Sequence, residues 1–331
     1  MIQTALFTSG KFRKVANGIA LAPKNSFRWI YASNPNKSET EKLAKEAGVQ
    51  QNIFSEYYKE PRSRKYASTP LQFVIVDYYI QNKKITKSRV LFILTENTLL
   101  TVMPTKSNYY DTLFGRVVED LKREKNRAIS LGTILYQFLE EDTEDNYDVL
   151  HANDEEIIKL EEAASNFEGE NIPTAQIVKF KRELFKMSRR FWSSAKIIFL
   201  LRKGLTPVKL DNESKSLLDN TYDTFVHQLD MLSNQQEMLS DIITIYTTKV
   251  SNEINRRVKK LTYITLVLTG LALVISIPNT VATIFGIPFL PHEFLASKWE
   301  YIVASLVLST ILSIGWLLMY WQKHGVYKEK S

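Results

Sequence analysis

A row of mostly polar side chains runs through an apolar stretch near the end of this 331-residue chain. Alternating steps of three and four residues connect the members of this row, and such spacing places them on one face of a helix. The polar row consists of Asn255, Val258, Thr262, Thr265, Thr269, Ala272, Ser276, Asn279 and Thr283. Polar side chains within an apolar helix usually face protein or water rather than lipid. The row therefore predicts a water-lined path, which needs several copies of the chain around one axis because a single row cannot enclose a pore.

A second interpretation of the polar row stays open. Ser and Thr hydroxyls also donate to carbonyl oxygens of their own helix or hold neighbouring helices together. One isolated Thr is best explained in that way, whereas a row along the whole stretch favours the water-lined path.

This region contains two apolar runs, residues 261–287 and 299–321. Each exceeds the roughly 20 residues that a helix needs to cross about 30 Å of hydrocarbon. Basic residues lie before the first run and after the second, and Trp and Tyr residues lie near the ends of the second run. The positive-inside bias predicts a cell-membrane protein with both termini in the cytoplasm and an external loop at 288–298. The residues behind this prediction are Arg256, Arg257, Lys259, Lys260, Lys323, Lys328 and Lys330, with Trp299, Tyr301, Trp316, Tyr320 and Trp321 at the interfaces.

The preceding part of the chain predicts an α+β protein. Residues 1–108 form a mixed domain with strands expected at 17–23, 27–32, 73–79, 88–94 and 98–103. A helix is expected to begin at Ser38, which has Glu41 three residues later, and to end at Gly48. Helical periodicity then predicts helices at 111–140, 149–166, 173–202 and 212–284. The expected division is a helical region at 109–210, a stalk at 211–260, membrane helices at 261–287 and 299–321, and a basic tail at 322–331.

The expected stalk helix has an apolar face and a polar face in the residues that precede most of the polar row. Its apolar face comprises Tyr222, Phe225, Leu229, Leu232, Leu239, Ile243, Tyr246, Val250 and Ile254. Its polar face comprises Asn220, Asp223, His227, Asp230, Asn234, Glu237, Asp241, Thr244, Thr248 and Ser251. Any amphipathic helix has a wet face, but continuation of that face into an apolar run is not expected from amphipathicity alone. Acidic rings attract cations, and hard cations such as Mg²⁺ prefer oxygen ligands.

Composition excludes several other classes of protein. The chain has no Cys, and hence no disulfide, thiolate nucleophile or Cys-based metal site. The net charge of +7 is explained by membrane orientation and lipid headgroups, without a nucleic-acid partner. No phosphate-binding Gly loop, nucleophile elbow or metal-hydrolase motif predicts an enzyme. The carboxylates of 140–161 are best explained as a solvated face, with a divalent-cation site as the alternative.

Several segments together resemble the CorA family of divalent-cation transporters. The resemblance covers segments 28–49, 56–66, 95–104, 145–162, 178–191 and 222–262. Within the last segment, Asn255, Lys259, Leu261 and Thr262 match the family pattern Asn-x-x-Met-Lys-x-Leu-Thr, with Val258 in the Met position. No single match decides the family, and their order and spacing carry the resemblance.

The resemblance implies a homopentamer that moves Mg²⁺ first, with Co²⁺, Ni²⁺ or Zn²⁺ as further cations, driven by the membrane potential. The first apolar helix would line the pore and the second would form an outer ring. Asn255, Val258 and Leu261 would lie at the inner pore. Regulatory Mg²⁺ would bind to cytoplasmic carboxylates, for which Asp219, Asp223 and Asp230 are the candidates.

The chain departs from the family at the external entrance. Gly286-Ile287-Pro288 stands where the family has Gly-Met-Asn, so the amide that would hold a hydrated cation is absent. Asn279 lies about two turns earlier on the polar row and could supply a deeper amide ring. The interval before Gly286 is about seven residues longer than in the family, and a seven-residue insertion preserves the face.

Two alternatives to a Mg²⁺ channel stay open. One is a zinc transporter of the ZntB kind, which could be proton-coupled. The four histidines, His151, His227, His292 and His324, form no cluster in the sequence and argue weakly against a zinc cage. The other is a non-conducting membrane-anchored sensor or scaffold.

Overall fold

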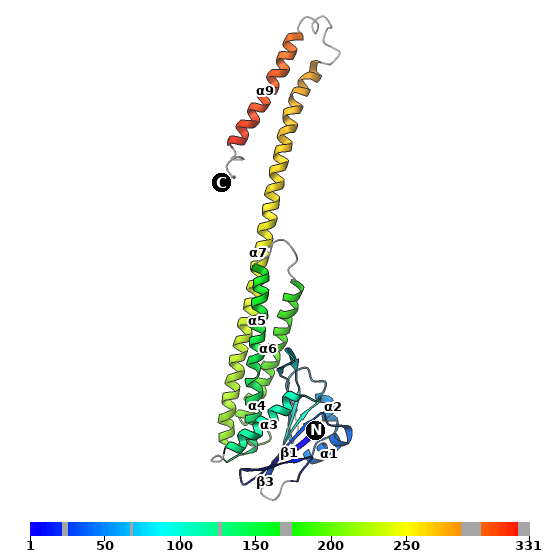
Figure 1. Ribbon diagram of the computed structural model, residues 1–331, viewed down its shortest axis with the longest axis vertical. Coiled ribbons are helices and arrows are strands. Elements are labelled where there is room, and N and C mark those ends of the chain that lie inside the picture. The colour runs from blue at the N-terminus through cyan, green and yellow to red at the C-terminus, as the bar shows by residue number, and fades with distance from the viewer. Residues whose placement is uncertain (22–25, 67–68, 125–127, 166–173, 286–298, 324–331) are drawn as a thin grey trace. The chain divides into compact units, whose positions relative to one another are not determined.

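The structure is a computed structural model of the chain, and it describes residues 1–331 apart from 22–25, 67–68, 125–127, 166–173, 286–298 and 324–331. The chain divides into two compact units, Met1–Tyr246 and Thr247–Ser331. In its described residues, the first unit contains the strands and helices α1 to α6 together with the beginning of α7, which continues into the second unit (Figure 1).

A seven-stranded sheet forms the centre of the first unit. Its strand order is β2-β1-β3-β9-β8-β5-β4; β3 and β9 pair in parallel and the remaining neighbours pair antiparallel. A separate hairpin consists of β6 and β7. The strands are β1 Ile2–Thr8, β2 Lys11–Asn17, β3 Ser26–Ser33, β4 Arg64–Tyr66, β5 Leu71–Ile75, β6 Tyr78–Gln81, β7 Lys84–Lys87, β8 Val90–Leu94 and β9 Thr98–Met103.

Helices cover both faces of the sheet, so its central strands are buried on both sides. Alternate residues of β3 point to opposite faces, so Ile30 packs with α1 and α2 while Trp29 packs against α3 and α4. The second unit contains the outer part of α7 and α9. The helices are α1 Lys37–Ala47, α2 Asn52–Tyr57, α3 Asn108–Arg123, α4 Leu131–Glu144, α5 Asn146–Ser165, α6 Thr174–Arg202, α7 Asn212–Phe285 and α9 Trp299–Lys323.

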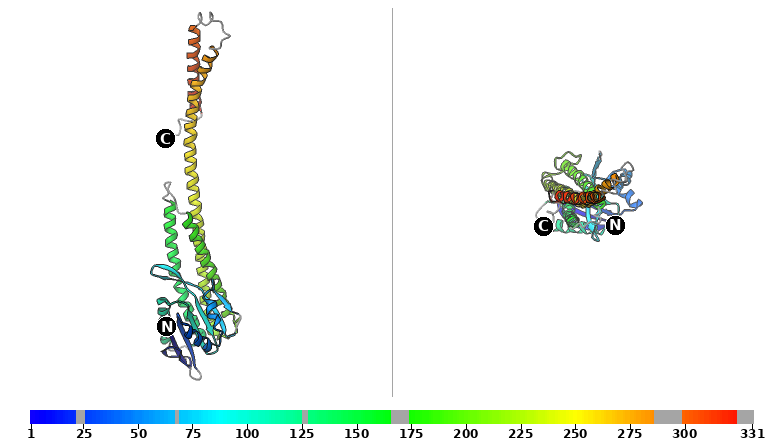
Figure 2. Two further views of the ribbon diagram at one scale, coloured as in Figure 1. Left: turned by 90° about the vertical axis from the view of Figure 1, so that its right-hand side faces the viewer. Right: turned by 90° about the horizontal axis from the view of Figure 1, so that it is seen from above.

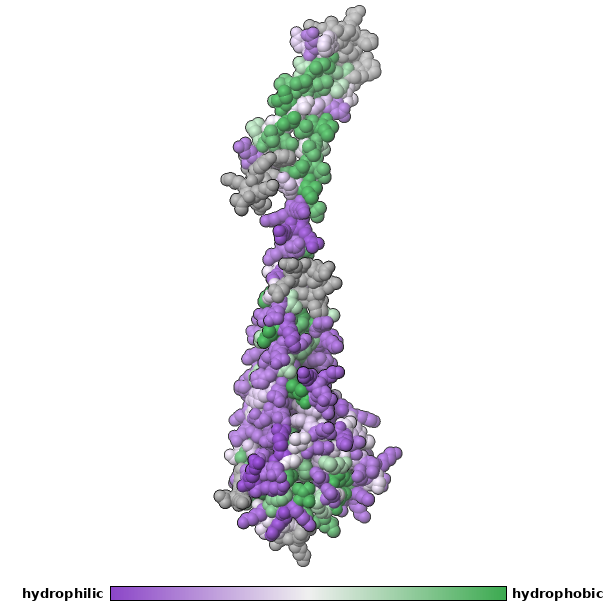
Figure 3. Space-filling model, in the orientation of Figure 1, coloured by the Kyte–Doolittle hydropathy of each residue, from purple (hydrophilic) through white to green (hydrophobic). Residues whose placement is uncertain are grey.

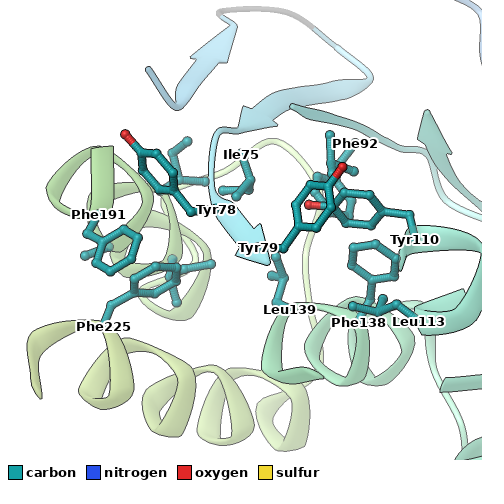
Figure 4. Close-up of a cluster of buried hydrophobic side chains, with 14 of the residues drawn as sticks. Ile75, Tyr78, Tyr79, Phe92, Tyr110, Leu113, Phe138, Leu139, Phe191 and Phe225 are labelled. Carbon is teal, nitrogen blue, oxygen red and sulfur yellow. The ribbon is translucent and has the colours of Figure 1, made fainter. Parts of the chain in front are cut away.

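Within the first unit, α5 and α6 lie along the beginning of α7 (Figure 2). Aromatic side chains connect helices to strands, as Figure 4 shows for Tyr78 of β6 beside Phe191 of α6 and Phe225 of α7, and for Phe92 of β8 beside Tyr110 of α3 and Phe138 of α4. The rings of Phe191 and Phe225 are 5.9 Å apart, which joins α6 to α7. This packing fixes the stalk portion of α7 on the sheet domain.

The second unit has the composition of a membrane anchor. Its parts of α7 and α9 are long and apolar enough to cross a membrane, and only 6% and 11% of their most apolar windows are buried within the chain. The space-filling view shows hydrophobic residues on the surface of these helices (Figure 3). Exposed apolar side chains on this scale require lipid or further protein around them.

The expected helix at 212–284 is confirmed, since α7 runs from Asn212 to Phe285. The expected strand at 17–23 is wrong in its described part, because β2 ends at Asn17 and residues 18–21 form no strand. The expected strand at 73–79 is two strands, β5 and β6, which separate at Val76 and Asp77. The expected helix at 111–140 is likewise two helices, because α4 starts anew at Ser130, whose hydroxyl accepts from the backbone N–H of Thr133.

Candidate functional site

Every residue of the polar row lies on one uninterrupted helix and is exposed in the single chain. Pro278 lies inside this helix without ending it. Because Pro has no N–H, the carbonyl of Val274, one turn before Pro278, loses its usual helical donor. The row therefore has the continuity that the sequence predicted.

The threonine hydroxyls of the row donate back into their own helix. Thr262 Oγ1 donates to the Val258 carbonyl at 2.9 Å, and Thr269 Oγ1 and Thr283 Oγ1 donate to the carbonyls of Thr265 and Asn279, each at 2.8 Å. The back-bonding of the second interpretation is thus present. A hydroxyl oxygen that donates its hydrogen keeps lone pairs that accept. The row consequently offers hydrogen-bond acceptors to a partner whose outer atoms are hydrogens, such as water bound to a cation.

The inner half of the row also borders a cavity shared with α9. This cavity of about 560 Å³ is lined from α7 by Val258, Leu261, Thr262, Thr265, Leu266, Thr269, Gly270 and Leu273, and from α9 by Trp316, Leu317 and Tyr320. Its lining thus combines threonines of α7 with aromatic side chains of α9. The outer half of the row, from Ala272 to Thr283, does not border it.

Other predicted site residues lie apart from the row. Gly286, Ile287 and Pro288 fall outside the described residues. Asp219, Asp223 and Asp230 are all exposed, and Asp219 forms an ion pair with Arg202 at 2.6 Å. Within the described ranges, no group of three or more His, Cys, Asp or Glu side chains is arranged to hold a metal ion.

A buried polar seam on α7 was missed by the sequence analysis. Ser214, Thr221, Gln228 and Gln235 recur every seven residues and are each at most 2% exposed. Gln228 Nε2 donates to the Thr143 carbonyl at 2.7 Å, and Gln235 Nε2 donates to the Leu150 carbonyl at 2.9 Å. The seven-residue spacing was the signal that could have revealed this seam beside the apolar face.

A pair of buried carboxyl groups lies next to this seam and was also missed. Asp77 and Asp142, called here the carboxyl pair, are 1% and 2% exposed. Asn146, at the start of α5, donates through Nδ2 to Asp77 Oδ2 at 3.1 Å and to Gln228 Oε1 at 3.4 Å. Tyr109 donates to Asp142 Oδ1 at 3.1 Å. The pair is therefore connected through Asn146 to α7.

Burial shifts both acids of the carboxyl pair toward the neutral form. It raises the pKa of Asp77 to about 7, against a smaller opposing effect of the Asn146 hydrogen bond. Burial raises the pKa of Asp142 well above its ordinary value, and the negative charge of Asp77 adds to this rise.

Comparison with known proteins decides the family. The family described as CorA-like Mg²⁺ transporter protein matches residues 24–323. The chain belongs to the CorA family. Its membership, together with the two apolar helices of the second unit, places the chain among membrane transporters of divalent cations.

Individual relatives are distant. The chain is 23% identical over 254 residues to the cobalt/magnesium transport protein CorA of Thermotoga maritima, covering 76% of this chain and 69% of the relative. Its fold matches the complete CorA magnesium transporter of Methanocaldococcus jannaschii with a TM-score of 0.63 and 17% identity, covering 94% and 96% of the two chains. It matches the full-length CmaX protein with a TM-score of 0.61 and 14% identity, covering 96% and 97%. The likeness to the ZntB cytoplasmic domain of Vibrio parahaemolyticus is weaker, with a TM-score of 0.50, 11% identity and coverage of 68% and 88%.

Proposed function

We propose that the chain forms a homopentameric channel that conducts divalent cations, Mg²⁺ first, along an axis lined by the polar row of α7. The single observation that carries this proposal is the unbroken polar row within an apolar helix of a CorA-family chain. Co²⁺ and Ni²⁺ are further expected cargoes. Cytoplasmic divalent cations gate the channel, and the membrane potential drives entry.

The chemistry of the row suits a hydrated cation. Mg²⁺ gives up its waters reluctantly, so it travels with part of its hydration shell. Those waters present hydrogens outward, and the row presents the lone pairs of Thr262, Thr269 and Thr283 together with the amide of Asn279. A doubly charged ion gains about 4.6 kcal/mol from a potential of about 100 mV, so entry needs no ATP.

The basic residues 256–260 support a cytoplasmic stalk with both termini on that side. The exposed ring positions Val258 and Leu261 are the proposed hydrophobic constriction, which closes by excluding water. Asp223 and Asp230 remain exposed candidates for the gating cation, while Asp219 already holds Arg202.

Cation uptake into proteoliposomes tests the proposal. Purified protein is reconstituted, an inside-negative potential is imposed, and Mg²⁺, Co²⁺, Ni²⁺ and Zn²⁺ are compared with protein-free vesicles. The expected result is potential-driven uptake of Mg²⁺. Uptake of Zn²⁺ alone that follows a proton gradient supports the ZntB-like alternative. No uptake of any cation by an assembled oligomer contradicts transport and favours the sensor or scaffold.

A further inference from the structure

No cationic side chain in the described part of the chain pairs with the carboxyl pair. Asp77 leaves the sheet between β5 and β6, and Asp142 comes from the last turn of α4. Among the described residues, no Lys, Arg or His forms an ion pair with either of them; Arg116 instead holds Glu141 and Asp145 at 3.4 and 2.5 Å. Two ionised carboxylates cannot remain close together in a dry interior without a compensating positive charge.

The side chain of Asn146 indicates independently that a hydrogen-bond donor is missing beside the carboxyl pair. This side chain is fully buried, its Nδ2 is engaged by Asp77 and Gln228, and its Oδ1 has no hydrogen-bond partner. Asp145 joins α4 to α5 in helical conformation, so Asp142 and Asn146 lie one turn apart on the same face. A buried acceptor without a donor costs free energy. A protonated Asp142 places an O–H within one helical turn of this oxygen.

Among the residues that the structure describes, the groups around the pair include no other acid or base that takes this role. From α3 the pair is faced by Tyr109 and Tyr110, whose pKa values are both raised by burial, so both stay neutral. From the end of α4 it is faced by Asp145, a further negative charge. Gln228 of α7 and Ser88, which follows β7, do not titrate; the Ser88 N–H donates to the Asp77 carbonyl at 2.9 Å.

We propose that Asp77 and Asp142 form a proton-binding pair that holds at least one proton at neutral pH and couples the cytoplasmic pH to the packing of α7. The proton comes from solvent water and forms one O–H bond on a carboxyl oxygen of Asp142. It donates to Asn146 Oδ1, and the Asn146 amide then donates to Asp77 Oδ2 and Gln228 Oε1. Gln228 closes the chain by donating to the Thr143 carbonyl. Loss of protons at high pH places two negative charges that repel each other beside Asn146. This repulsion weakens the hydrogen bond that connects Asn146 to Gln228 of α7.

An effect of this pair on cation flux rests on the proposed function, because α7 is the helix that carries the polar row. The protonation itself does not rest on that function. It is therefore tested first by measurements that need no transport.

Infrared spectroscopy of the full chain in detergent at neutral pH tests the wild-type protein directly. The expected result is a carbonyl band from a protonated carboxyl group, shifted in heavy water and weakened in Asp142→Asn, in which only Asp77 of the pair can still hold a proton. Absence of this band from the wild-type protein, or an undiminished band in a folded Asp142→Asn variant, overturns the proposal.

The pH dependence of thermal unfolding is the second measurement. Each proton bound only by the folded state lowers the folding equilibrium constant about tenfold per unit rise in pH. The apparent Tm of the wild-type protein should fall between about pH 5 and about pH 8. Asp142→Asn keeps a donor for Asn146 Oδ1 and should reduce this slope by one proton. The exposed Asp148→Asn, a matched change on α5, should leave it unchanged.

Two outcomes of the thermal measurement contradict the proposal. An unchanged slope in folded Asp142→Asn means that the pair binds no proton on folding. A rise in Tm on addition of MgCl₂ at constant pH, present in the wild type and lost in Asp142→Asn, means that a metal ion balances the pair instead. Uptake assays then separate the two proposals: protonation without any flux leaves this inference standing and removes the proposed channel.

Discussion

At the scale of single residues, the polar side chains of α7 fall into two groups that the sequence alone cannot separate. Gln228 and Gln235 are buried with amide donors engaged by backbone carbonyls, while Asn279 is exposed beside Pro278. A hydrogen bond to a fixed carbonyl holds a side chain in place. An exposed amide on an apolar helix is instead available to a passing ion, which makes Asn279 the residue to test.

Replacing Asn279 by Ala is expected to lower Mg²⁺ uptake at least about tenfold, because about 1.4 kcal/mol of lost interaction with the hydrated ion at the barrier corresponds to that factor. Uptake and selectivity are measured in proteoliposomes. Thr280→Ala is the matched control, since Thr280 is the neighbouring exposed residue, lies off the row and bonds back to the Ser276 carbonyl at 2.8 Å. Equal flux and selectivity in Asn279→Ala and the wild type would contradict the hypothesis that Asn279 forms a deeper amide ring.

At the scale of elements, some boundaries follow from local chemistry and others depend on tertiary packing. Gly48 ends α1 as expected, because its φ of 65° lies in the left-handed region that favours Gly. The start of α1 is ambiguous in the sequence, since both Asn36 and Ser38 precede a Glu by three residues. The structure uses Asn36, whose Oδ1 accepts from the Glu39 N–H at 2.9 Å.

The missed features share a physical cause. The run 73–79 has strand-like composition throughout, yet it breaks at Asp77, whose burial depends on Asn146, 69 residues away. The exposed polar face and the buried polar seam of α7 have similar residue types. The helices that pack on α7 determine which of these two polar surfaces is buried, and the periodicity of the sequence does not show where those helices pack. The long helix, the two apolar runs and the polar row were predictable because they depend on composition and spacing within one segment.

Gln235 tests whether the buried polar seam stabilises the stalk. Gln235→Ala should lower the unfolding free energy by about 1–3 kcal/mol, since it leaves the Asn153 amide with only the weak Met187 sulfur as an acceptor and opens space in the interior. The apparent Tm of the full chain should fall by several degrees. Gln236→Ala is the control, because Gln236 is the next residue on the helix and is less buried. Equal losses in both variants would mean that the buried contacts of Gln235 contribute no more to stability than those of a less buried neighbour, which contradicts a stabilising role of the seam.

At the scale of the whole molecule, the central question is which surroundings the polar row has in the membrane. In the single chain its inner half borders the cavity with Trp316, Leu317 and Tyr320 of α9. In a pore, the inner half of the polar row must instead face the same residues of the other copies of the chain around an axis. The absence of Cys from the sequence makes this question accessible, because any disulfide then reports only on residues that are introduced.

Val258→Cys should form disulfide-linked dimers on mild oxidation in the membrane, because neighbouring copies bring this position close to the axis and a disulfide requires Cα atoms within about 7 Å. Leu312→Cys on α9 is the control; Leu312 is 63% exposed and lies away from the row, so it should stay monomeric. The products are separated by non-reducing electrophoresis. A double variant, Val258→Cys with Tyr320→Cys, distinguishes the alternative. If it gives only an internal bond, and Val258→Cys alone gives no dimer, the row faces its own α9 and does not line a pore. Dimers from Val258→Cys at several expression levels would instead show that the row faces its counterpart in another copy, as conduction along α7 requires.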